Sequence, residues 1–327
     1  MSKLFKFSDT FFDTFQSKTK TMSLKIIFMG TPEFAVPSLD ILLKNGYDIV
    51  GVVTAPDRLG GRGKSQVIES PIKKYALEKG LKILQPEKLK NTDFLEDLKS
   101  LHADLQIVVA FRMLPEVVWK MPKLGTMNLH GSLLPKYRGA APINWAIING
   151  ETETGVTTFF LKHEIDTGDC FLQHKIPILD TDNAEDLHDK MMQVGAETVL
   201  KSVKLIEKNE VKTTIQSDSE VMHAPKIFHE TCEINFLQST EKIYNFVRGL
   251  SPHPTAWTTL NGENLKIFAA SKEITAHQLK VGTFVSNKKD FLKIVTQDGF
   301  INCHNIQLEG KKRMDIVSFL NGYKKEI

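Results

Sequence analysis

The sequence predicts an α/β protein, with a doubly wound, mostly parallel sheet followed by a smaller C-terminal β-barrel domain of the oligonucleotide-binding type. Three observations lead to this prediction. Short apolar runs alternate with helical patterns early in the chain, strand-like runs without intervening helices occupy its end, and 327 residues exceed the usual size of one domain. We expect an N-terminal extension, a larger domain, a linker and a small domain, over residues 1–22, 23–208, 209–226 and 227–327.

The larger domain is expected to begin with a β-α-β unit. Apolar runs at 24–30 and 48–56 have the composition of buried strands. The residues between them have apolar side chains at helical spacing, at Phe34, Leu39, Leu42 and Leu43. The same alternation continues with expected strands at 81–86, 104–111 and 125–131 and helices at 71–80 and 94–102. It is typical of a parallel sheet covered by helices.

The pattern changes after Thr157. Two strands joined by a turn are expected at 155–162 and 170–178, followed by a long helix at 184–208. Asp182 is expected to be the N-cap of this helix, and Glu185 to complete a capping box.

The small domain is expected to begin, after a polar linker, with a helical segment at 239–250. An Asn261-Gly262 pair predicts a tight hairpin turn between the first two of its strands. Several short strands close together predict a small barrel, at 256–260, 264–270, 281–287, 292–299 and 300–308.

The composition is that of an average globular protein, with 41% hydrophobic and 25% charged residues. No apolar window is long enough to span a membrane, so no membrane contact is expected. Cys170, Cys232 and Cys303 lie far apart without a C-x-x-C pair, which favours a reducing, cytoplasmic location over a disulfide framework or a structural zinc. The first 22 residues lack the apolar core of a secretory signal, and Asp9 and Asp13 disfavour a transit peptide.

Several common catalytic motifs are absent. The "GRGKS" stretch at 61–65 is not a phosphate loop, because Arg58 stands where that motif needs its first glycine. The first strand continues into "GTPEF" and not into a glycine-rich dinucleotide fingerprint. No G-x-S-x-G surrounds Ser132, so the motif of a serine hydrolase is absent. No H-E-x-x-H occurs, so the motif of a zinc protease is absent as well, and no metal is expected.

The stretch "MNLHG" at 127–131 carries the strongest candidate site. Along a strand Asn128 and His130 point to the same face, and both lie near its carboxyl end, where open α/β sheets form ligand crevices. An amide donor beside an imidazole suits an oxygen that becomes anionic as a carbonyl turns tetrahedral. A turn downstream, "HEIDTGD", offers Asp166 and Asp169 as the carboxylate. A structural pair of polar side chains is the other reading of Asn128 and His130.

The stretches "MNLHGSLLPKYRGAAPI" and "IDTGD" resemble the motifs of the formyltetrahydrofolate-dependent formyltransferases. Further stretches of the sequence resemble one branch of this family, whose acceptor is the methionyl group carried by initiator tRNA. These stretches are "IIFMGTPEFAVPSL", "VTAPDRLGGRGK", "APKI", "VRGLSPHPTAW" and "LEGKKRM". The resemblance covers about 24–323, nearly the whole chain. It implies 10-formyltetrahydrofolate as co-substrate, initiator methionyl-tRNA as partner, no metal and no obligatory protein partner.

The resemblance also implies roles for individual residues. Asn128, His130 and Asp166 match the catalytic residues of the family. The residues implied in folate binding are Ser132, Leu133, Leu134, Pro135, Ala110, Phe111, Leu114, Pro115 and Ile165. This chain reads "AFRMLP" where many relatives read A-Y-G-x-I-L-P, so it is one residue shorter there. A basic, glycine-rich loop is implied to reach the tRNA through Arg58, Arg62 and Lys64.

Two other functions remain open from the sequence. The acceptor could be glycinamide ribonucleotide, an amino sugar nucleotide or water, although the motifs after His223 fit the tRNA branch. The chain could also be a non-catalytic RNA-binding protein that uses its small barrel, in which case binding would survive loss of Asn128, His130 and Asp166.

Overall fold

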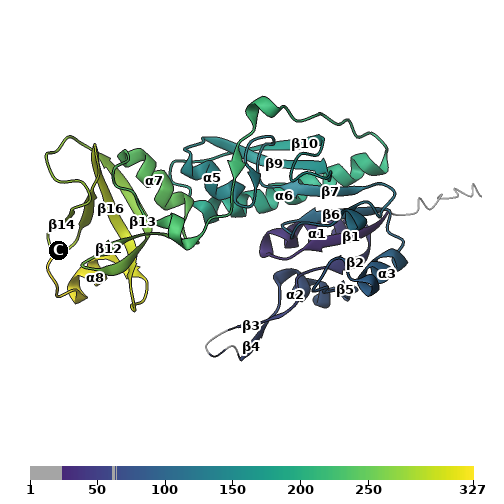
Figure 1. The fold of residues 1–327 in the computed structure, drawn as a ribbon, viewed down its shortest axis with the longest axis horizontal. Coiled ribbons are helices and arrows are strands. Elements are labelled where there is room, and N and C mark those ends of the chain that lie inside the picture. The colour runs from purple at the N-terminus through teal and green to yellow at the C-terminus, as the bar shows by residue number, and fades with distance from the viewer. Residues whose placement is uncertain (1–23, 61–62, 64) are drawn as a thin grey trace, which may run out of the picture.

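The structure is a computed structural model that describes residues 24–60, 63 and 65–327. The predicted extension at 1–22 lies outside the described residues. Figure 1 shows a larger part built on one sheet, a smaller β-rich part at the other end of the long axis, and a thin hairpin that leaves the larger part. The hairpin consists of β3 (Arg58–Gly60) and β4 (Gln66–Ile68).

The large sheet has seven strands in the order β10-β9-β7-β6-β1-β2-β5. Five are parallel, and β9 and β10 form an antiparallel hairpin at one edge. This confirms the predicted mostly parallel sheet. The strands are β1 (Lys25–Gly30), β2 (Asp48–Val53), β5 (Ile83–Leu84), β6 (Leu105–Val109), β7 (Thr126–His130), β9 (Glu153–Phe160) and β10 (Cys170–Pro177).

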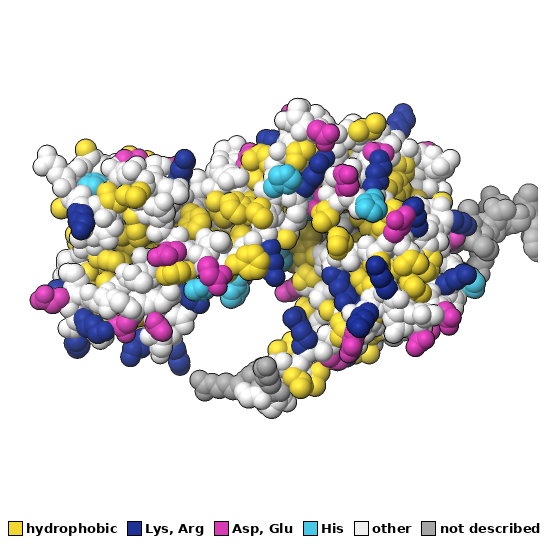
Figure 2. All heavy atoms as spheres, viewed as in Figure 1, with side chains coloured by type: hydrophobic (Ala, Val, Ile, Leu, Met, Phe, Trp, Pro, Cys, Tyr) yellow, Lys and Arg dark blue, Asp and Glu magenta, His cyan; other side chains and the backbone are white. Residues whose placement is uncertain are grey.

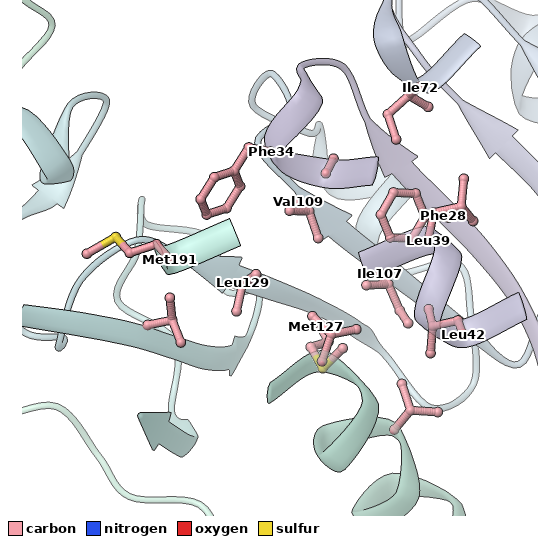
Figure 3. Close-up of a cluster of buried hydrophobic side chains, with 14 of the residues drawn as sticks. Phe28, Phe34, Leu39, Leu42, Ile72, Ile107, Val109, Met127, Leu129 and Met191 are labelled. Carbon is pink, nitrogen blue, oxygen red and sulfur yellow. The ribbon is translucent and has the colours of Figure 1, made fainter. Parts of the chain in front are cut away.

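Both faces of this sheet are covered, as a doubly wound fold requires. Ile26 and Phe28 of β1 pack into one core, whereas the alternate residues Ile27 and Met29 pack into another on the opposite face. Figure 3 shows the first core, where Leu39 lies close to Phe28 beside Ile107 of β6. The helices of this part are α1 (Val36–Lys44), α2 (Pro71–Glu78), α3 (Thr92–Ser100), α4 (Glu116–Trp119), α5 (Pro142–Ile148) and α6 (Ala184–Glu207).

The N-cap prediction for the long helix α6 was wrong by one residue. Asn183 is the N-cap, and its side chain accepts hydrogen bonds from the backbone N–H groups of Glu185 and Asp186. Asp186, not Glu185, completes the capping box by accepting from the Asn183 N–H. The carboxylate of Asp182 is engaged elsewhere, since it accepts from the Leu179 N–H at 2.8 Å and from the Lys190 ammonium at 2.6 Å.

The smaller part is an antiparallel sheet in the order β12-β13-β16-β15-β14, with β17 paired to β16. The sheet curls around its own core together with α7 and α8. Among the described residues its edge strands β12 and β14 do not pair, so it forms a half-barrel and not a closed barrel. The elements are α7 (Thr240–Gly249), β12 (Ala256–Leu260), β13 (Glu263–Ile274), β14 (Phe284–Ser286), β15 (Leu292–Val295), β16 (Gly299–Leu308), β17 (Met314–Asp315) and α8 (Ile316–Gly322).

Helix α7 joins the two parts. Arg248 on α7 is only 8% exposed, and its guanidinium donates to the carbonyl oxygens of Leu179 and Asp182 at 3.0 and 2.8 Å. The Asn144 amide of α5 donates to the Gly249 carbonyl at 2.8 Å. These buried contacts explain why "VRG" in the long motif around 247–257 carries an arginine followed by a glycine, since a side chain at Gly249 would meet α5.

Candidate active site

Asn128 and His130 lie at the carboxyl end of β7, which runs between β6 and β9 in the large sheet. Asn128 is half-buried and His130 is 7% exposed. Both side chains line one cavity, whereas the intervening Leu129 packs into the core on the other face. The strand periodicity therefore placed the two polar groups on the same side of the sheet, as expected.

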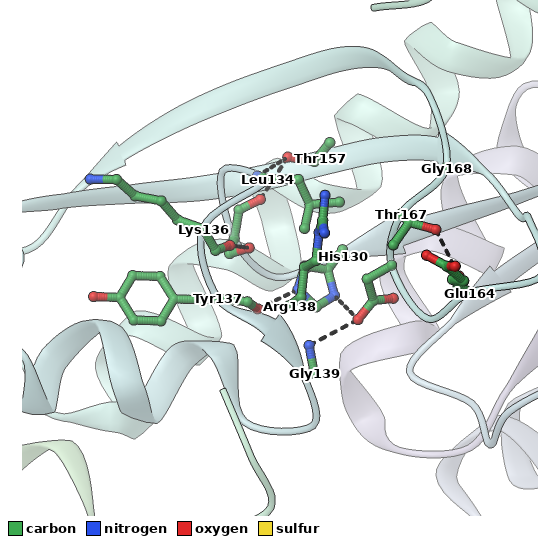
Figure 4. A network of polar contacts seen from close by, with 12 residues as sticks. His130, Leu134, Lys136, Tyr137, Arg138, Gly139, Thr157, Glu164, Thr167 and Gly168 are labelled. Carbon is green, nitrogen blue, oxygen red and sulfur yellow. Dashed lines mark hydrogen bonds and ion pairs between the residues drawn. The ribbon is translucent and has the colours of Figure 1, made fainter. Parts of the chain in front are cut away.

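The imidazole of His130 is held by a backbone carbonyl. Its Nε2 lies 2.8 Å from the Tyr137 oxygen, and because a carbonyl only accepts, Nε2 carries the hydrogen and donates. Its Nδ1 faces the Asp166 carboxylate at 3.8 Å. Figure 4 shows His130 between Tyr137 on one side and the turn with Glu164, Thr167 and Gly168 on the other. The structure thus brings Asn128, His130 and Asp166 to one place.

Tyr137 is itself firmly anchored. It is 2% exposed, and its phenol donates to Glu151 at 2.9 Å. Burial raises the pKa of this phenol above its ordinary value, so it stays a neutral donor. A fixed side chain fixes the position of its carbonyl and, through it, the plane of the His130 ring.

Asp166 lies in the turn between β9 and β10. Its Oδ2 accepts from the Gly139 N–H at 2.9 Å, and its backbone has a φ of 55°, in the left-handed region. Asp169, the other carboxylate of this turn, pairs with the Lys162 ammonium at 2.7 Å and does not line the cavity. The geometry therefore separates two aspartates that the residue pattern alone left equivalent, and it favours the one that the family resemblance implies.

The cavity over the end of β7 has a volume of about 720 Å³. This lies within the usual range for small-molecule sites, and the lining includes the apolar side chains of Val108, Phe111, Leu114, Trp119 and Leu161. Asn128, His130 and Asp166 line the same cavity, and Val108 on β6 is the direct neighbour of Asn128 on β7. A flat aromatic ligand that ends in a polar reacting group suits a cavity that combines these apolar and polar side chains. A smaller cavity of about 500 Å³, at residues 84–97, contains none of these three.

The residues predicted to bind folate fall into two groups. Ala110, Phe111, Leu114 and Ile165 line the cavity, and Pro115 lines the hollow next to it.

The other predicted folate contacts, Ser132, Leu133, Leu134 and Pro135, are not among the lining residues. The Ser132 hydroxyl donates to the Lys136 carbonyl at 2.6 Å, and the Leu134 N–H donates to the Thr157 hydroxyl at 3.1 Å. These contacts shape the loop that ends at Tyr137, so this segment holds the carbonyl on which His130 depends.

The predicted tRNA contacts are only partly described. Arg58 is exposed on β3, in the projecting hairpin, whereas Arg62 and Lys64 lie outside the described residues. In the described part of the chain no cluster of three or more histidine, cysteine or acidic side chains could hold a metal ion. None of the described helices is both long and apolar enough to cross a bilayer.

The chain was compared with known proteins and structures. Residues 24–203 match the family model of formyl transferases, and residues 226–324 match that of the formyl transferase C-terminal domain. Two solved structures share the fold at low identity. WlaRD, a sugar 3N-formyl transferase, has a TM-score of 0.64 at 24% identity over 88% of this chain and 99% of its own. An N-formyltransferase from Helicobacter canadensis has a TM-score of 0.66 at 23% identity over 89% and 100%.

A mostly parallel sheet with an amide, an imidazole and a carboxylate over a cavity at its strand ends defines a group-transfer enzyme of the formyl transferase type. With both family models matched, the chain belongs to the formyl transferase family. Curated relatives named methionyl-tRNA formyltransferase are 53% identical to it, in Parabacteroides distasonis over 93% of this chain and 97% of the relative, and in Flavobacterium johnsoniae over 91% and 96%.

Proposed function

We propose that this protein transfers the formyl group of 10-formyltetrahydrofolate to the α-amino group of methionine esterified to initiator tRNA, for the initiation of translation. The observation that carries the proposal is the identity of 53% to methionyl-tRNA formyltransferases along almost the full length of both chains. It extends over the small domain, which supplies a second surface for a large acceptor. A translation enzyme with three free, buried cysteines belongs in the cytoplasm.

In the proposed reaction the methionyl amine attacks the formyl carbon. His130 acts here in its protonated form, in which Nε2–H stays on the Tyr137 carbonyl and Nδ1 also carries a hydrogen. The Asn128 amide and this Nδ1–H donate to the oxygen as it becomes anionic, and the Asp166 carboxylate accepts the proton that the amine loses. The bond from the formyl carbon to N10 then breaks, and N10 gains a proton. One proton leaves the acceptor and one joins the donor, so no oxidant or reductant is required.

Two features of the site support these roles. The 3.8 Å between Nδ1 of His130 and Oδ2 of Asp166 exceeds the length of a hydrogen bond, so Nδ1 remains available to donate to a substrate oxygen. A covalent enzyme intermediate is not needed. The nearby Cys170 is buried, which raises the pKa of its thiol to about 11, so this cysteine stays a neutral thiol.

The test is direct formyl transfer by the purified protein. Incubation with 10-formyltetrahydrofolate and methionyl initiator tRNA should produce formylmethionyl-tRNA, detected after mild alkaline release by mass spectrometry. Parallel reactions with glycinamide ribonucleotide or a dTDP-amino sugar as acceptor should give no formylated product. Formylation of one of these and not of the tRNA would contradict the proposal, and tRNA binding without any transfer would favour a binding protein.

The acceptor should also make the reaction salt-dependent. Figure 2 shows an open arch between the projecting hairpin and the small domain, with lysine and arginine side chains on the small domain beside it. If about four phosphates are contacted there, the KM for the tRNA should rise about a hundredfold between 50 and 200 mM salt. The KM for the folate, measured in the same series, should change far less. A KM for tRNA that does not change with salt would contradict contact with a polynucleotide.

A further inference from the structure

The segment between the two family-matched parts, residues 204–225, belongs to neither match. The polar composition of residues 209–226, which include most of this segment, predicts only a linker. The structure instead places part of it against the active site. We call residues 214–224 the strap, because both ends of this segment pair with loops that carry site residues.

The first end of the strap pairs with the turn that carries Asp166. The backbone groups of Thr214 and Cys170 exchange two hydrogen bonds, at 3.0 and 2.7 Å. The second end pairs with the loop after the catalytic histidine, because β11 (His223–Ala224) lies parallel to β8 (Arg138–Gly139). Gly139 is the residue whose N–H binds the Asp166 carboxylate. The strap therefore touches both backbone segments that place this carboxylate.

Gln216 is the third residue of the strap and makes four side-chain hydrogen bonds. Its Nε2 donates to the carbonyl oxygens of Asp166 and Gly168, both at 2.8 Å. Its Oε1 accepts from Nε and Nη2 of Arg138, at 3.0 and 2.8 Å. The orientation of the amide is unambiguous, because carbonyls only accept and a guanidinium only donates. The Gln216 amide therefore uses both of its donors and both of its acceptor positions to link the Asp166 turn to the loop that contains Arg138.

The turn that Gln216 holds needs an external support. Asp166 has a left-handed φ of 55°, a conformation that is uncommon for residues with a side chain, although aspartate adopts it more readily than most. At Gly168 a Cβ atom would lie 1.8 Å from the Phe160 carbonyl oxygen, so the turn also runs tightly against β9. With the carbonyls on either side of Thr167 fixed by Gln216, the direction of the Asp166 side chain is fixed as well.

We infer that Gln216 is a positioning residue for formyl transfer, which fixes the Asp166 turn from the linker between the two domains. The inference rests on the proposed function for its effect on rate, but its structural part stands alone. It also means that the catalytic site is complete only when the linker lies in place.

Two variants separate the parts of this inference. Gln216→Met keeps the length of the side chain and removes all four hydrogen bonds. Gln216→Glu keeps the acceptor for Arg138, and so keeps the strap attached, but sets an oxygen against the carbonyls of Asp166 and Gly168. Ile215→Ala is the matched control, since Ile215 is 82% exposed on the neighbouring position of the strap.

Both Gln216 variants should lower kcat about 10- to 100-fold, as small misplacements of a reacting group do. The KM values for the tRNA and the folate should stay within about twofold, because Gln216 does not line the cavity and its amide is fully hydrogen-bonded within the protein. Hydrogen–deuterium exchange of residues 163–170 should be faster in both variants than in the wild type. Ile215→Ala should match the wild type in every measurement.

Each other outcome has a definite meaning. A kcat within about twofold of wild type in the folded Gln216→Met variant would overturn the inference. If Gln216→Met fails to fold, Gln216→Glu decides in its place. If the wild type itself shows no formyl transfer, the proposed function fails, and exchange in residues 163–170 still tests the positioning, which an unchanged exchange rate would refute.

Discussion

Replacing Asn128 by alanine should reduce kcat for formyl transfer about 100- to 1,000-fold, the usual loss when one donor to a developing oxyanion is removed. The reason lies in what the amide does not contact. Asn128 is half-buried at the end of β7 and lines the cavity, yet no hydrogen bond joins its amide to another described residue. A structural role would require such a partner, so the free amide favours a role toward substrate.

The measurement is steady-state kinetics together with thermal unfolding. The Asn128→Ala protein should keep the melting temperature of the wild type within a few degrees, because no internal hydrogen bond is lost. Asn128→Asp should be impaired at least as strongly, since it sets a negative charge beside the anionic oxygen. Asn321→Ala, on the exposed side of α8, is the control and should leave kcat unchanged. Wild-type turnover by folded Asn128→Ala would remove this residue from the mechanism.

The part of the site that sequence reasoning could reach is the part set by strand periodicity. Asn128 and His130 share a face because alternate residues of any strand do. Both residues lie near the carboxyl end of the strand, where sheets of this kind form their ligand crevice, so they lie beside that crevice. The order of apolar runs likewise predicted the mostly parallel sheet and the antiparallel sheet that follows. These features depend only on local sequence pattern, so they can be predicted without knowledge of long-range contacts.

The remaining part depends on backbone atoms and distant contacts, which carry no sequence signal. The group that orients His130 is the carbonyl of Tyr137, and every residue has a carbonyl. Gln216 reaches Asp166 across 50 positions of the chain from a segment whose polar composition indicates only a linker. The N-cap of α6 shifted from Asp182 to Asn183 because a nearby lysine and a backbone N–H bind the aspartate. Local propensity could not rank these two neighbouring capping residues.

Asp166→Asn should lower kcat about 100- to 10,000-fold, the range for loss of a positioned general base. The amide retains an oxygen for the Gly139 N–H, so the turn keeps its shape while the negative charge beside His130 Nδ1 is lost. The substitution thus removes the acceptor for the amine proton and little else.

The matched control is Asp169→Asn in the same turn. Asp169 pairs with the exposed Lys162 and lies outside the cavity, so its loss should cost at most about 1 kcal/mol of stability and leave kcat within about twofold. Single-turnover rates with saturating substrates would measure the chemical step for both proteins. If the two aspartate variants were slowed equally, the loss would reflect general disturbance of the turn. Only a large difference between them, with equal melting temperatures, assigns the proton transfer to Asp166, because the two side chains differ chiefly in facing His130 or facing Lys162.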